Sequence, residues 1–184
     1  MSNFCKQLLL SGVVTTIAFV NAPVTPRNQY LLYVLASGVG EILGRPYLGY
    51  LSLCRIEDKC IVSKTWILAS VNVSILFFMV FASWFRILPH FYAAVLIVMV
   101  NTLLTGVVYV NSFHNAGEGL TMEEKRFCRA LISGALWSSS MAVALIGLDT
   151  ESRLRKHCLL LFPEVSCYTR SPIPWTPSTS CVLQ

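Results

Sequence analysis

Two residues of opposite charge stand inside an otherwise apolar stretch of the chain. Glu41 and Arg45 are four residues apart, so on a helix their side chains share one face and can pair. A charge near the bilayer centre costs about 2.5–3.5 kcal/mol, so such residues normally face a bundle interior or an aqueous cavity. Two interpretations follow: a polar pocket or ion path, or a salt bridge at the membrane edge in a helix bent by Pro46. Gly40 and Gly44 favour close approach of another helix on this face.

Further polar residues interrupt the later apolar runs. Asn72 and Asn101 are either hydrogen-bonding contacts between helices or contacts to a substrate. Asn111 and His114 lie near the end of a run. A histidine at a membrane exit is either a group that titrates near neutral pH and senses an acidic lumen, or simply an interfacial residue.

Several function classes are excluded by missing motifs. The chain contains no GxSxG, HExxH or P-loop sequence, and no enzyme is expected. None of its seven cysteines forms a CxxC pair, so neither a metal site nor a cofactor is predicted. The net charge of +5 is scattered in short clusters between apolar runs, which is typical of membrane orientation signals and not of nucleic-acid binding.

The composition indicates that the elements carrying these residues lie in a membrane. Hydrophobic residues make up 55% of the 184 and charged residues only 12%, against about 25% charged in soluble domains. A helical span needs about 20 residues. The sequence therefore predicts an all-α polytopic transmembrane helical bundle in residues 1–148. About five spans are expected, near 7–20, 30–53, 66–84, 91–113 and 130–148, with four as the alternative.

The start of the chain has a second interpretation. Lys6 precedes the apolar run from Leu8 to Val20, as in a secretory signal peptide. The residues that follow lack a clean small-x-small cleavage site, so a span is the preferred interpretation. Lysine and arginine residues are nearly balanced between the two sides of the membrane and do not fix the orientation.

Residues 149–184 are predicted to form a polar, disordered tail that is rich in proline and serine. The chain ends in Cys181-Val182-Leu183-Gln184, a C-a-a-X box whose final glutamine indicates farnesylation of Cys181. Cys158 follows a basic cluster and is a candidate for palmitoylation. Farnesylation takes place in the cytosol, so it requires a cytosolic tail.

One stretch resembles the battenin family, the lysosomal membrane proteins associated with Batten disease. Tyr109-Val110-Asn111-Ser112-Phe113-His114-Asn115 is similar to a Tyr-Val-Asn-Thr-Phe-His-Asn stretch at the end of a late span in that family. Glu123-Glu124-Lys125-Arg126-Phe127, Trp66-Ile67-Leu68-Ala69 and the terminal box also resemble family features. The resemblance runs from about Asn28 to Leu148 and returns at the last four residues.

This resemblance implies a multispanning protein of the lysosomal or late-endosomal membrane, similar to one half of a major-facilitator fold. It implies efflux of small solutes, glycerophosphodiesters or basic amino acids, and a part in lysosomal pH homeostasis. The residues then expected at a substrate cavity are Glu41, Arg45, Asn72, Asn101 and Asn111, with His114 as a pH-responsive position.

Family members are much longer, and the chain resembles only their carboxy-terminal half. Major-facilitator transporters hold their substrate between two halves. A truncated half is therefore expected, whose partners are the lipid bilayer, a small-molecule solute and either the missing N-terminal half or a second copy. The alternative function is a non-transporting membrane adaptor whose tail recruits vesicle-trafficking partners.

Overall fold

The computed structural model describes residues 1–19, 22–53, 61–62, 64–116, 119–161, 167 and 169, and all regular elements in them are helical. The predicted all-α class is therefore confirmed. The elements, in chain order, are α1 (Ser2–Leu8), the π-helix η1 (Leu9–Val13), the 3-10 helix η2 (Val14–Thr16), α2 (Pro26–Gly44), α3 (Tyr47–Leu53), α5 (Thr65–Phe85), α6 (Phe91–Asn115) and α7 (Met122–Leu161).

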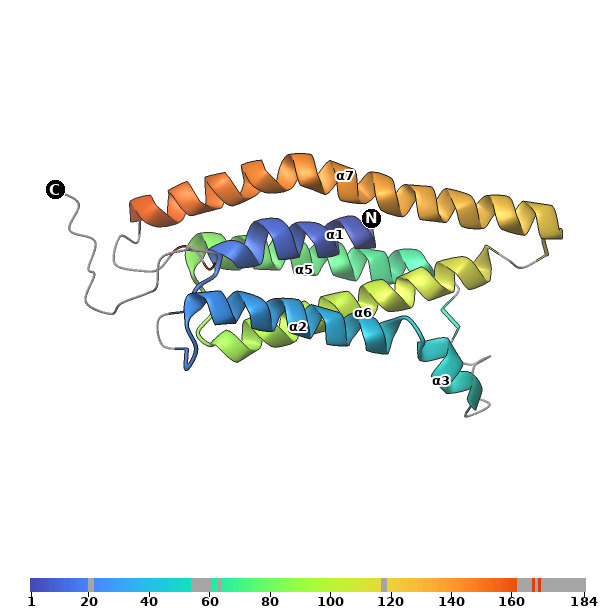
Figure 1. The fold of residues 1–184 in the computed structure, drawn as a ribbon, viewed down its shortest axis with the longest axis horizontal. Coiled ribbons are helices and arrows are strands. Elements are labelled where there is room, and N and C mark those ends of the chain that lie inside the picture. The colour runs from blue at the N-terminus through green and yellow to red at the C-terminus, as the bar shows by residue number, and fades with distance from the viewer. Residues whose placement is uncertain are drawn as a thin grey trace.

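The helices form an elongated bundle (Figure 1). The longest helix, α7, runs along the whole length of the bundle and packs mainly on α1 and η1. Helices α2 and α6 pack side by side, and α5 contacts both α6 and α1. The segment formed by α1, η1 and η2 therefore lies between α7 and the other helices.

Three described helices are long and apolar enough to cross a membrane: Thr65–Phe85, Phe91–Asn115 and Met122–Leu161. They contain the three charge-free spans predicted near 66–84, 91–113 and 130–148. By length and composition the described residues therefore hold about three spans, fewer than the five expected.

The predicted span near 30–53 is not a single helix. Helix α2 begins at Pro26, which suits a first helical position, and ends at Gly44. Pro46 supplies no backbone N–H and its ring disfavours a continuous helix through Arg45. The chain turns there, and α3 starts at Tyr47 and projects from the end of the bundle (Figure 1).

The predicted span near 7–20 is also wrong as a regular helix. After Leu8 the backbone widens into a π-helix and then tightens into a 3-10 turn that ends at Thr16. Hydroxyl side chains bond back to helix carbonyls here: Ser11 Oγ donates to Gln7 O at 2.8 Å and Thr16 Oγ1 to Val13 O at 2.7 Å. Such bonds compete with regular helix geometry. The irregular backbone is tolerated because this segment is buried inside the bundle.

Helix α7 extends beyond the predicted end of its span. It begins with a capping box, in which the Thr121 backbone N–H donates to Glu124 Oε2 at 2.8 Å. It continues past Leu148 to Leu161, so the predicted boundary between bundle and tail falls inside a helix. An ion pair four residues apart, Arg153 to Asp149 at 2.8 Å, lies in this extension.

The outer surface of the bundle is apolar. Phe77 on α5 is 69% exposed, and Trp137 and Leu145 on α7 are 75% and 80% exposed. Many large exposed apolar side chains are unusual on soluble monomers and are typical of helices that contact lipid.

Candidate functional site

A cavity of about 200 Å³ opens where α1, α2, α6 and α7 meet. The N-terminal end of α1 forms one wall with Met1, Ser2 and Asn3. Because α1 starts part-way along the bundle (Figure 1), the cavity lies beside its first turn and not at the end of the bundle.

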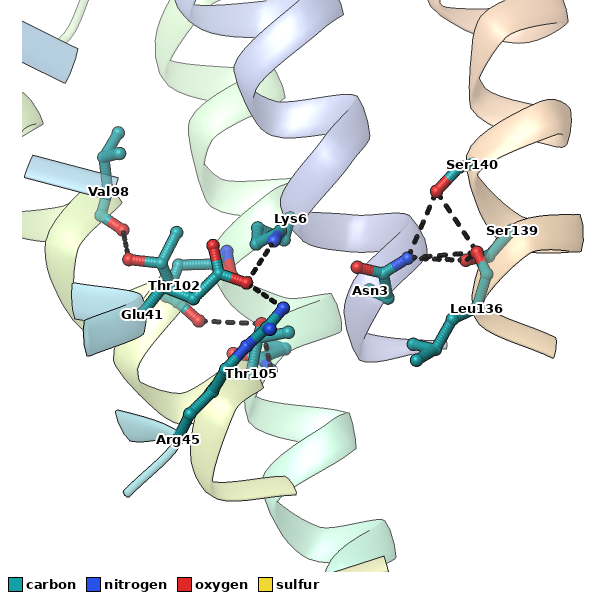
Figure 2. Close-up of polar contacts among 12 residues, drawn as sticks. Asn3, Lys6, Glu41, Arg45, Val98, Thr102, Thr105, Leu136, Ser139 and Ser140 are labelled. Carbon is teal, nitrogen blue, oxygen red and sulfur yellow. Dashed lines mark hydrogen bonds and ion pairs between the residues drawn. The ribbon is translucent and has the colours of Figure 1, made fainter. Parts of the chain in front are cut away.

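Two cations converge on one carboxylate at this cavity. Lys6 Nζ of α1 lies 3.1 Å from Glu41 Oε1 of α2, and Arg45 pairs with the same oxygen. Figure 2 shows Glu41 held between the two basic side chains. The Lys6 side chain is 7% exposed, Glu41 29% and Arg45 55%. A buried ammonium group requires a partner of opposite charge, and Glu41 supplies it for Lys6.

The predicted pairing of Glu41 with Arg45 is present, and it is part of a larger site. Arg45 also lies over the Tyr109 ring, with its guanidinium carbon 5.3 Å from the ring centroid. The site therefore combines the salt-bridge and pocket interpretations, because the ion pair lines the cavity. The charged side chains of the cavity lining are two cations and one anion, so their net charge is positive.

The opposite wall is joined to α1 by neutral hydrogen bonds. Asn3 Nδ2 donates to Ser139 Oγ at 2.8 Å and to Leu136 O at 3.3 Å, both on α7 (Figure 2). Helix α1 is therefore attached to α2 through Lys6 and to α7 through Asn3. Lys6 and Asn3 were not predicted as site residues, because their partners lie on other helices and leave no local spacing signal.

Close packing of α2 on α6 positions the charged pair. A Cβ on Gly40 would collide with Thr102 Oγ1, and one on Gly44 with Leu103 O. A Cβ on Gly106 would lie 2.8 Å from the Arg45 backbone nitrogen. The predicted close approach of a second helix to the Gly40 and Gly44 face is confirmed, with α6 as that helix.

Asn72 and Asn101 lie deeper than the cavity lining, and both are completely buried. Asn72 Nδ2 donates to Thr105 Oγ1 at 3.2 Å, and Thr105 lines the cavity. Asn72 Oδ1 and both amide atoms of Asn101 have no hydrogen-bond partner among the described residues. A buried polar group without a partner costs about 1–3 kcal/mol.

Asn111 and His114 lie outside the cavity lining. Asn111 is fully buried; its Oδ1 accepts from the Val62 backbone N–H at 2.8 Å, and its Nδ2 donates to the Tyr47 hydroxyl. His114 is exposed in the last turn of α6. Tyr109 and Ser112 of the same stretch do line the cavity. Some residues of the Tyr109–Asn115 stretch therefore line the cavity, and Asn111 instead holds α3 and Val62 against α6.

The end of the bundle away from α3 holds a second cluster. Cys158 at the end of α7 forms a disulfide with Cys167, and both are buried. Arg86 donates to Cys158 Sγ at 2.8 Å and to Ala18 O at 3.1 Å. Burial lowers the pKa of the Arg86 guanidinium below its usual range. Thr169 donates from its backbone N–H to Thr15 O at 2.9 Å, which satisfies a carbonyl near the end of η2.

The predicted modification sites fall on the tail. In the disulfide, Cys158 has no thiol to accept a palmitoyl group, so palmitoylation stays a prediction for the reduced protein. Cys181 lies outside the described residues.

Comparison with known proteins identifies the family. Residues 5–157 match the family described as CLN3 protein. The chain is 29% identical to battenin of Canis lupus familiaris over 145 residues, which cover 79% of this chain and 30% of battenin. It is 28% identical to protein BTN1 of Eremothecium gossypii over 131 residues, which cover 71% of this chain and 30% of BTN1.

No solved structure matches the chain. The matched regions are less than a third of the length of both relatives. The family match itself extends over most of the chain, from within α1 to the last turns of α7. This multi-pass helical membrane protein therefore belongs to the CLN3 protein family, the family of battenin.

Proposed function

We propose that the chain forms the solute-binding part of a transporter in the lysosomal or late-endosomal membrane, and that its cavity binds a small anionic phosphodiester. The observation that carries the proposal is the convergence of Lys6 and Arg45 on the single carboxylate of Glu41 at the cavity wall. The lysosomal placement, and a part in pH homeostasis, come from the resemblance to the battenin family.

The charge balance supports one of the two solute classes that the family resemblance implies. A basic amino acid brings a cationic side chain toward Lys6 and Arg45 and is opposed by like charge. A glycerophosphodiester brings a phosphate, which arginine binds through parallel N–H donors and lysine through its ammonium group. The structure therefore favours a glycerophosphodiester over a basic amino acid.

The cavity volume agrees with a small solute. Pockets for drug-sized ligands occupy about 300–1,000 Å³, and this cavity is smaller. In a major-facilitator arrangement the second half of the transporter would close the opposite side of the site. The proposal therefore includes an N-terminal half or a second copy as partner.

Ligand-induced stabilisation of the purified chain tests the solute class. Glycerophosphoglycerol, whose phosphodiester is its only charge, should raise the Tm in detergent at millimolar concentration, because binding to the folded state stabilises it by mass action. L-arginine at the same concentration should not. The double substitution Lys6→Met/Arg45→Gln should abolish the shift, whereas Arg153→Gln, which removes an exposed cation remote from the cavity lining, should preserve it. A larger shift with arginine than with glycerophosphoglycerol would contradict the proposal.

The cellular placement needs a separate test. A fluorescently tagged chain should colocalise with lysosomal membrane markers; confinement to the plasma membrane would overturn that part of the proposal. The adaptor alternative depends on residues 149–184, of which the structure describes 149–161, 167 and 169. The contacts of these described residues do not favour the adaptor function over transport.

A further inference from the structure

Two fully buried polar side chains of the central spans are incompletely bonded. Asn72 on α5 and Asn101 on α6 have no exposed surface. Within the described part of the chain, Asn72 Oδ1, Asn101 Oδ1 and Asn101 Nδ2 make no hydrogen bond. Amide groups in a bilayer interior are normally satisfied, so these three atoms indicate a bound group.

The unpartnered amides are connected to the cavity through one residue. Thr105 lines the cavity and lies one helical turn from Asn101 on the same face of α6. Its hydroxyl accepts from Asn72 Nδ2 at 3.2 Å and donates to the backbone carbonyl oxygen of Asn101 at 2.9 Å. Because the single hydroxyl proton is already donated, the Thr105 side chain cannot satisfy the two unpartnered amide oxygens. A further hydrogen-bonding group is needed behind Thr105.

The chemistry of the three atoms matches water. Two are carbonyl oxygens that accept hydrogen bonds, and one is an NH₂ nitrogen that donates them. A water molecule donates twice and accepts, so one or two waters satisfy the set. A metal ion fits poorly, because residues 65–85 contain no acidic or basic side chain and residues 91–115 contain only His114 at the far end.

We propose that Asn72 and Asn101 bind water and form a hydrated branch of the cavity that reaches the middle of α5 and α6. The branch deepens the proposed function, since it carries the polar surface of the solute site to the centre of the bundle. It depends on the cavity, and not on which solute the cavity binds.

Cysteine reactivity tests the hydration directly. Asn101→Cys is treated with methyl methanethiosulfonate in membranes from expressing cells, and the labelled cysteine is identified by peptide mapping. Only the thiolate reacts, and a thiolate forms readily only where water reaches the sulfur. Val98→Cys is the matched control, because Val98 is on the same helix, close to Asn101, and equally buried. Asn101→Cys should react at least tenfold faster than Val98→Cys.

Equal, slow labelling of the two variants would show a dry site and overturn the proposal. If Asn101→Cys does not accumulate in the membrane, Asn72→Cys gives the same measurement on α5, with the equally buried Met79→Cys as its control. The solute proposal is tested separately, by the Tm shift with glycerophosphoglycerol. Rapid labelling without a Tm shift would therefore support the hydrated branch and contradict the solute proposal. A Tm shift with slow labelling would support the solute proposal and contradict the hydrated branch.

Discussion

Lys6 and Glu41 are separated by 35 residues in the sequence, and their charged groups meet at 3.1 Å across the interface between α1 and α2. Glu41 has a second cationic partner in Arg45, whereas Glu41 is the acidic partner that the structure shows for Lys6. The two residues therefore depend on each other to different degrees. Lys6 needs Glu41 more than Glu41 needs Lys6.

Removing the carboxylate is predicted to be the most damaging change at the cavity. Glu41→Gln leaves the buried Lys6 ammonium without an opposite charge, which should lower the free energy of unfolding by about 3 kcal/mol. Lys6→Met leaves Glu41 paired with Arg45 and should cost about 1 kcal/mol, close to the net value of one hydrogen bond. Thermal unfolding of both variants in the same detergent measures the difference. A greater loss for Lys6→Met than for Glu41→Gln would refute this hierarchy.

The glycine contacts between α2 and α6 lead to a second prediction. Gly44→Ala places a methyl group against Leu103 O and should force the helices apart, at a cost of about 1–3 kcal/mol. Gly38→Ala on the same helix is the control, since a Cβ there meets nothing within 4 Å. It should be neutral or stabilise by about 0.5–1 kcal/mol through helix propensity. Equal Tm values for the two variants would show that the helices do not approach closely at Gly44.

The spans and the cavity differ in how far the sequence predicts them. Charge-free length is a local property, so the three spans could be placed from residue types alone. Glu41 and Arg45 share a face through helical spacing, which is also local. Lys6 gave no such signal, because its pairing depends on how α1 packs against α2. Its position before an apolar run suggested a signal peptide instead.

The irregular first helix was missed for a related reason. No proline interrupts Leu9–Thr16, and the break arises from hydroxyl groups that bond back to the backbone and from close packing around Gly12. The closely spaced Ser11, Thr15 and Thr16 were the only sequence signal. By contrast, Pro46 gave a clear signal for the end of α2. The span prediction treated this proline as a bend and extended the helix past it.

The two cysteine chemistries of the tail are predicted to exclude each other. A Cys158–Cys167 disulfide persists in an oxidising compartment, whereas farnesylation of Cys181 occurs in the cytosol. Mass spectrometry under non-reducing conditions should therefore find the linked Cys158 and Cys167 peptides only in molecules with an unmodified Cys181. Cys5 and Cys128 should remain free thiols in the same preparation. One molecule carrying both the disulfide and the farnesyl group would disprove the exclusion.

Asn111 and His114 belong to the same family-like stretch, and their substitution is predicted to have different effects. Asn111 is buried and binds both the Val62 backbone and the Tyr47 hydroxyl, so Asn111→Ala breaks the attachment of α3 to α6. Hydrogen–deuterium exchange in Tyr47–Leu53 should become faster, and the unfolding free energy should fall by about 1–3 kcal/mol because the partners of Asn111 lose a bond in a buried setting.

His114→Ala supplies the matched control, three residues along the same helix. The imidazole is exposed and does not line the cavity, so exchange in α3 and the Tm should both stay unchanged. A loss of α3 protection in His114→Ala comparable to that in Asn111→Ala would contradict the assignment, since it would assign the anchoring of α3 to the exposed histidine. Retained protection in Asn111→Ala would show that the remaining contacts of α3 hold it without the amide.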